Sequence, residues 1–218
     1  MRDAMKRELE HLLPADIERR SFEIISAELE GRGIVLPEET APIVKRVIHT
    51  TADFDYAESL VFSPGVVETA RAALRAGAAV VTDTQMARAG INKTSLARFG
   101  GEVRCFMSDP DVAAGAKENG TTRAVASMDK ASALPGPLLF AVGNAPTALI
   151  RLCELVSEGS LRPAAVIGVP VGFVNVVEAK ELLLESGVPC IVARGRKGGS
   201  NVAAAIVNAL LYGMEGGR

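Results

Sequence analysis

Short, continuously apolar segments alternate with amphipathic segments from about residue 79 to the end of the chain. This alternation predicts a parallel sheet covered by helices, because consecutive parallel strands are joined by helical crossovers. The apolar segments lack the alternation of apolar and polar residues seen in half-exposed strands, so we expect both faces of the sheet to be buried. Strands are predicted at five segments, residues 79–82, 103–107, 138–142, 164–168 and 190–193.

Signals for helix starts and ends separate these predicted strands. Asp109 precedes Pro110 after the second strand, and Asn144 lies two residues ahead of Pro146 after the third. Each pair combines a residue that caps a helix N-terminus with a proline suited to the first turn. Gly187 marks the end of a helix before the last strand. The sequence therefore predicts a three-layer α/β fold, Rossmann-like, with a five-stranded, mostly parallel sheet.

Two amphipathic segments, residues 17–29 and 42–51, precede this pattern with no strand between them. They predict an N-terminal helical extension over residues 1–60, ahead of an α/β body over residues 61–218. The chain has no linker rich in glycine, serine and proline and no internal repeat of fixed period. We therefore expect one domain spanning residues 1–218.

Composition narrows the classes of protein that this chain resembles. Of its 218 residues 48% are apolar, and the formal net charge is −2. With no Trp and only two Tyr, the chain lacks the basic stripes and stacking aromatics of a nucleic-acid surface. No apolar run reaches the roughly 18 residues of a membrane span, and no export signal is visible. Three separated cysteines in apolar runs fit buried thiols in a reducing cytoplasm.

The richest candidate site is a glycine-rich, basic turn after the last predicted strand, residues 194–200, with sequence RGRKGGS. Backbone N–H groups in such a turn, followed by a helix N-terminus, favour binding of an anion. Alternatively, Gly198 and Gly199 serve only to close a tight turn. The turn does not match a dinucleotide or P-loop motif, so the sequence indicates an anion without specifying which one.

Three further residues are candidates for chemistry. His49 lies opposite the apolar stripe of its predicted helix, which leaves it either solvated or catalytic, whereas His11 has no motif around it. Asp83 ends the first predicted strand and either contacts a ligand or caps the next helix. Arg123 is expected in the first turn of a helix, at a ligand or at the surface. No cluster of metal-ligand residues and no Ser-His-Asp order is found.

A series of sequence blocks resembles those of precorrin-8X methylmutases, including the cobalt-precorrin-8 branch. The blocks follow in order through nearly the whole chain, and GNAPTAL together with GVPVGFV is specific to the family. They are RSFEII at 20–25, VIH at 47–49, FSP at 62–64, AGA at 76–78, Asp83 with Met86, TRA at 122–124, GNAPTAL at 143–149, GVPVGFV at 168–174, and RGR with GGS at 194–196 and 198–200.

The resemblance implies an isomerase that moves a methyl group from C11 to C12 of a tetrapyrrole polycarboxylate, with no methyl donor and no cofactor. It also implies a homodimer that binds the tetrapyrrole near the subunit interface, and proton transfer by His49. Any cobalt would belong to the substrate. The segment Ile17-Glu18 slightly favours the cobalt-precorrin-8 branch. Expected substrate contacts are Ser21, Asp83, Arg123, Asn144, Thr147, Arg194, Gly195, Gly198, Gly199 and Ser200.

Two alternatives come from other classes of protein. A corrinoid carrier would use the same loops to hold and pass on the product, without any need for a titratable group over the ring. A phosphometabolite enzyme would use the RGRKGGS turn for a phosphate.

Overall fold

The computed structural model describes residues 13–214 of the chain, which divide into two compact units. The first ends at Val35 and contains helix α1 (Pro14–Gly31), and the second begins at Leu36 and contains all other elements. No glycine or proline interrupts α1 between residues 16 and 30, so its backbone hydrogen bonds run without a break. Two of its apolar side chains, Ile17 and Ile24, are exposed.

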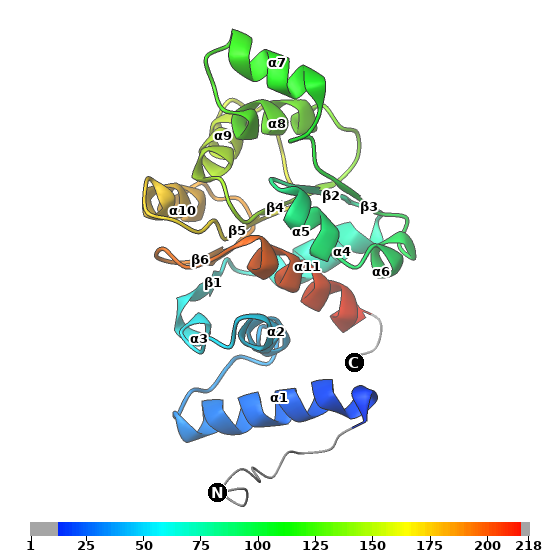
Figure 1. Cartoon of the computed structure of the whole chain (residues 1–218), viewed down its shortest axis with the longest axis vertical. Coiled ribbons are helices and arrows are strands. Elements are labelled where there is room, and N and C mark those ends of the chain that lie inside the picture. Colours follow the sequence, from blue (N-terminus) through cyan, green and yellow to red (C-terminus); the bar gives the residue numbers. More distant parts are fainter. Residues whose placement is uncertain (1–12, 215–218) are drawn as a thin grey trace, which may run out of the picture. The chain divides into compact units, whose positions relative to one another are not determined.

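The second unit is built around a mixed sheet, labelled in Figure 1. Among the described residues the sheet has six strands in the order β1-β6-β5-β4-β2-β3. Only β1 is antiparallel, where it pairs with β6, and the other neighbours are parallel. The strands are β1 (Leu60–Phe62), β2 (Ala79–Thr82), β3 (Glu102–Arg104), β4 (Leu138–Val142), β5 (Ala165–Gly168) and β6 (Cys190–Ala193).

The predicted α/β class and the five predicted strands are confirmed, although β3 covers Glu102–Arg104 where residues 103–107 were predicted, and the strand count is corrected from five to six. The added strand, β1, was not predicted because it has three residues, Leu60–Phe62, too few for a periodic pattern. It forms because its backbone completes the edge of β6, and Ser63 Oγ accepts a hydrogen bond from the N–H of Cys190 at 2.8 Å. The central strand β4 is buried at every position, as its continuous apolarity predicts.

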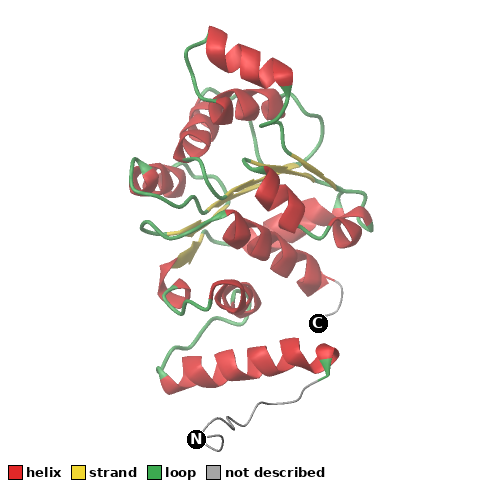
Figure 2. Ribbon diagram, viewed as in Figure 1, coloured by secondary structure: helices red, strands yellow, loops and turns green. Residues whose placement is uncertain are grey.

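Helices cover both faces of the sheet (Figure 2), which gives the three predicted layers. On one face, side chains of α8, α9 and α10 pack with strand residues such as Phe140 and Val166 into a single core. On the other face, α11 contacts α2, α4 and α5 as well as β4 and β5. The helices are α2 (Ala41–Thr51), α3 (Tyr56–Ser59), α4 (Val66–Arg75), α5 (Gln85–Gly90), α6 (Lys93–Ala97), α7 (Pro110–Glu118), α8 (Arg123–Ser132), α9 (Pro146–Ser157), α10 (Val176–Glu185) and α11 (Ser200–Met214).

Helix α2 belongs to the compact unit that holds the sheet. Its apolar stripe, which includes Ile43 and Val47, is buried, and α2 packs against α11. Arg46 lies over the ring of Tyr212, with the guanidinium carbon 5.2 Å from the ring centre. The compact unit that holds the sheet therefore begins at Leu36.

Candidate functional site

The carboxyl ends of β2, β4, β5 and β6 meet at one edge of the sheet, because these four strands are parallel neighbours. The loops that leave them contain most of the predicted site residues. In open α/β sheets this edge is where ligands bind. The contacts among these loops determine which of their groups face outwards.

Asp83, directly after β2, organises the turn between β4 and α9. Its side chain is fully buried. One carboxylate oxygen accepts a hydrogen bond from the N–H of Gly143 at 2.8 Å, and the other accepts from Asn144 at 2.8 Å and Ala145 at 2.7 Å. Burial raises the pKa of this carboxyl group, and the three N–H donors oppose that effect. The turn before α9 is therefore held in place by Asp83, which directly follows a different strand, β2.

The alternative that Asp83 caps the next helix is wrong. Thr84 caps α5 instead, since its hydroxyl oxygen accepts from the N–H of Ala87 at 3.0 Å. The same hydroxyl lies 2.7 Å from the hydroxyl of Ser200, at the start of α11. The first and last of the four loops are thus joined directly.

Two glycines allow the loops after β4, β5 and β6 to touch through their backbones. A Cβ atom on Gly143 would lie 2.7 Å from the carbonyl oxygen of Gly199. A Cβ atom on Gly198 would lie 2.1 Å from the carbonyl oxygen of Val169. Gly199 also donates its N–H to Val169 at 2.9 Å, in a conformation with φ of +141°. Gly198 and Gly199 therefore do more than close a turn, because they seat it against the loop after β5.

Lys180, on α10, holds the turn after β6. Its side chain is fully buried, and its ammonium donates to the carbonyl oxygens of Gly195 at 2.7 Å and Lys197 at 2.8 Å. Burial lowers the pKa of Lys180 to about 8. Lys180 was not among the residues predicted from the sequence, although one signal was present. Lys180 lies on the same helical stripe as the buried Val176 and Leu183, where a lysine needs a partner.

The N-termini of α8 and α9 lie side by side. Thr122 caps α8 by accepting from the N–H of Val125 at 3.2 Å, and its hydroxyl lies 3.2 Å from that of Thr147 in α9. Arg123 is the first residue of α8 and is exposed, as is Asn144 in the turn before α9. The structure therefore brings Arg123, Asn144 and Thr147 into one neighbourhood.

His49 lies in the last turn of α2 and is exposed, opposite the buried stripe of that helix. Ala52 then turns the chain in a left-handed conformation towards Asp53 and Asp55. Both carboxylates accept from the ammonium of Lys197 at 2.6 Å. The C-terminal end of α2, which carries His49, is thus linked to the turn after β6.

The remaining predicted residues make other hydrogen bonds or lie outside the described range. Arg194 makes a two-point ion pair with Glu181 on α10, through Nε at 3.2 Å and Nη2 at 3.1 Å. Ser21 lies on α1 in the other compact unit, where its hydroxyl donates to the carbonyl of Ile17 at 2.9 Å. His11 lies outside the described residues.

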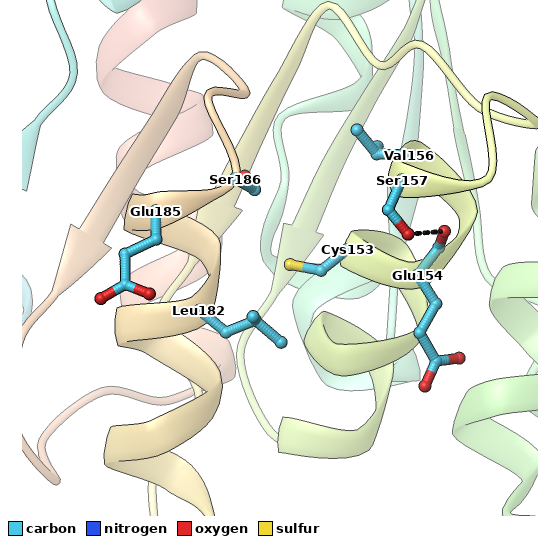
Figure 3. Close-up of a pocket in the computed structure, with 7 residues that line it drawn as sticks. All are labelled: Cys153, Glu154, Val156, Ser157, Leu182, Glu185 and Ser186. Atoms are coloured by element: carbon cyan, nitrogen blue, oxygen red, sulfur yellow. Dashed lines mark hydrogen bonds between the residues drawn. The ribbon is translucent and has the colours of Figure 1, made fainter.

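A surface pocket of about 380 Å³ lies elsewhere, between the C-terminal halves of α9 and α10 (Figure 3). Both helices start near the carboxyl ends of strands, so their C-terminal halves lie towards the opposite edge of the sheet. Burial raises the pKa of Cys153 in this pocket to about 11, so its thiol is a poor nucleophile at neutral pH. The lining residues are Cys153, Glu154, Val156, Ser157, Leu182, Glu185 and Ser186, none of them a predicted site residue.

No helix within residues 13–214 is both long enough and apolar enough to span a bilayer. Over the same described range, no group of three or more His, Cys, Asp or Glu side chains is placed to hold a metal ion. The geometry thus defines an α/β protein whose strand-end loops combine glycine turns, helix N-termini and an exposed arginine, a set suited to an anionic ligand.

Comparisons with known proteins identify the family. A family model described as precorrin-8X methylmutase matches residues 16–213. The cobalt-precorrin-8 methylmutase of Salmonella typhimurium is 49% identical over 93% of this chain and 96% of its own length. The precorrin-8X methylmutase of Pseudomonas aeruginosa is 42% identical over 91% of this chain and 95% of its own length. A crystal structure of precorrin-8x methyl mutase from Thermus thermophilus matches with a TM-score of 0.83 and 41% identity, covering 93% of this chain and 100% of that one.

This chain belongs to the precorrin-8X methylmutase family. It is accordingly an enzyme of the isomerase class, a methylmutase of cobalamin biosynthesis.

The Gly198→Ala substitution should disrupt the contact between the loops after β5 and β6. The added Cβ meets backbone atoms that cannot move aside alone, so we expect a loss of about 1–3 kcal/mol in the free energy of unfolding. Denaturant unfolding followed by circular dichroism measures this. Gly115→Ala, in α7 with no atom within 4 Å of its added Cβ, is the control and should stabilise slightly. Equal effects of the two substitutions would contradict the packing described.

The Asp83→Asn substitution should destabilise the protein by roughly 2–4 kcal/mol, because an amide group would face three N–H donors with one acceptor oxygen. The same unfolding measurement applies. Glu118→Gln, at an exposed carboxylate of α7 with no ion pair among the described residues, is the control and should leave the unfolding midpoint nearly unchanged. A wild-type midpoint for Asp83→Asn would mean that the carboxylate does not hold the turn.

Proposed function

We propose that this enzyme moves the methyl group on C11 of precorrin-8X, or of its cobalt complex, to the neighbouring C12. The bond from C11 to the methyl carbon breaks as the bond to C12 forms, and the double bonds of the macrocycle shift to give hydrogenobyrinate or cobyrinate. Because the methyl group stays within the substrate and no net electron is gained or lost, the step needs neither a methyl donor nor a redox cofactor. The observation that carries the proposal is the network of four strand-end loops, which contains the blocks GNAPTAL, GVPVGFV and RGRKGGS.

We propose that the strand-end loops bind the acetate and propionate carboxylates at the rim of the macrocycle. Arg123, at the N-terminus of α8, supplies a cation, and Asn144 and Thr147 supply polar side chains beside it. The turn after β6 supplies backbone N–H groups. Asp83 acts indirectly, by holding the turn after β4. The full set of proposed contacts is Ser21, Arg123, Asn144, Thr147, Arg194, Gly195, Gly198, Gly199 and Ser200.

His49 acts in our proposal as a proton or hydrogen-bond donor to a ring nitrogen or an adjoining position. Its exposure and the link from its helix to the turn after β6 support this role. Donation draws electron density from the ring and lowers the barrier to methyl migration. A positioned general acid contributes about 10²–10⁴ in rate. Binding supplies the rest by holding the ring in the geometry from which the methyl migrates on one face.

We further propose a cytoplasmic homodimer that acts on the cobalt-containing substrate. The exposed apolar side chains Leu13, Ile17 and Ile24 on the α1 segment support a subunit contact. The three free, buried cysteines fit a reducing compartment. The similarity to the Salmonella typhimurium enzyme, which is named for the cobalt form, supports the cobalt substrate.

The His49→Ala substitution should lower turnover by at least about 100-fold while leaving corrin binding largely intact, because only proton donation is lost. Turnover is followed by the change in visible absorption as migration alters the conjugation of the ring, with precorrin-8X and its cobalt complex assayed separately. Thr50→Ala, at the exposed neighbouring position, is the control and should keep wild-type turnover.

Three outcomes of that assay would contradict parts of the proposal. Full turnover by His49→Ala would remove His49 from the reaction. Tight binding without conversion by the wild-type enzyme would favour a corrinoid carrier. Faster conversion of metal-free precorrin-8X would reverse the choice of substrate.

A further inference from the structure

The turn after β6 has a one-sided backbone polarity. Its three consecutive carbonyl oxygens, at Gly195, Arg196 and Lys197, all accept hydrogen bonds from within the protein. The ammonium of Lys180 donates to the oxygens of Gly195 and Lys197. The N–H of Gly172 donates to the oxygen of Arg196 at 3.2 Å. The acceptors of this turn are therefore all occupied on the protein side.

The N–H groups of the same turn are in the opposite situation. Within residues 13–214, the N–H groups of residues 195–198 donate to no protein acceptor. The turn is followed by α11, which begins at Ser200. The first N–H groups of α11 also lack partners within the helix. A turn with bonded carbonyls and free N–H groups, followed by a helix N-terminus, binds anions through its backbone.

Lys180 is the group on which this polarity depends. A carbonyl oxygen turned into the protein needs a donor, since an unpaired buried acceptor is costly. The ammonium satisfies two such oxygens from one atom, 2.7 and 2.8 Å away. Without it, the peptide groups of Gly195 and Lys197 would have to rotate to reach water, and their neighbouring N–H groups would change direction with them.

Within residues 13–214, the charge on Lys180 has no carboxylate partner. Among the described residues Lys180 makes no ion pair, and burial is the only cause of its lowered pKa. Nearby carboxylates are taken up elsewhere, since Glu181 pairs with Arg194, and Asp53 and Asp55 pair with Lys197. An uncompensated buried cation is unfavourable, and a ligand carboxylate on the far side of the turn would offset it.

We propose that Lys180 is a positioning residue that sets the turn after β6 as the receptor for one rim carboxylate of the tetrapyrrole. The inference rests on the proposed function, because that function supplies the carboxylate. Lys180 does not touch the substrate. It acts through the backbone of residues 195–198 and through its charge beneath them, so it governs binding of carboxylates rather than the migration of the methyl group.

The test compares two probes, a cobalt corrin with free rim carboxylates and the same corrin with these groups converted to primary amides. Wild-type enzyme should bind the acid more tightly than the amide. In Lys180→Met this preference should fall by about ten-fold or more, because the turn loses its orientation and its charge. Turnover should show a raised KM with kcat within about two-fold of wild type. Lys117→Met, at an exposed lysine of α7, is the control and should keep the wild-type preference.

An unchanged preference for the acid in folded Lys180→Met, or a fall in kcat with unchanged KM, would overturn the proposal. Thermal unfolding checks the fold of each variant. If Lys180→Met does not fold, Lys180→Gln decides, since it keeps a donor without the charge and should still weaken the preference. Failure of the wild-type enzyme to bind either corrin would overturn the proposed function and this inference together, whereas wild-type turnover with an unaltered variant would overturn the inference alone.

Discussion

The hydrogen bonds to the carboxylate of Asp83 are the interaction on which the strand-end loops depend. This carboxylate accepts three consecutive backbone N–H groups, from Gly143 to Ala145, and so fixes the turn that begins α9. Lys180 does the converse two strands away, where its ammonium takes two carbonyl oxygens of the turn after β6. One buried carboxylate thus accepts hydrogen bonds from the turn after β4, and one buried ammonium donates hydrogen bonds to the turn after β6. We propose that the first turn presents side chains to the ligand and that the second presents N–H groups.

Backbone contact between loops makes this arrangement cooperative. Gly143 and Gly198 allow no Cβ, because each packs against the backbone of a neighbouring loop. The hydroxyls of Thr84 and Ser200 join the loops at the two ends of the series. A displacement of any one loop therefore affects its neighbours, and the groups that we propose as ligand contacts on these loops keep fixed relative positions. Such preorganisation lowers the entropy cost of binding a large, flexible ring.

The sequence predicted much of the fold because the buried strands have continuous apolar runs. It did not predict β1, whose three residues pair only because β6 offers an edge, and it did not predict that α2 packs on α11, because that is a tertiary contact. The family blocks identified the loops at the binding edge. They did not reveal that Asp83 faces inwards, nor that Lys180 is part of the same edge, because both depend on backbone groups of segments distant in sequence.

We propose above that the backbone of the turn after β6 receives a carboxylate of the tetrapyrrole. A crystal structure of the enzyme with its corrin product bound tests this most directly. We expect a rim carboxylate within hydrogen-bonding distance of the N–H groups of residues 195–198, with the Lys180 ammonium still bonded to the carbonyl oxygens of Gly195 and Lys197. A corrin bound with its carboxylates away from this turn, or Lys180 in direct contact with the ligand, would contradict it.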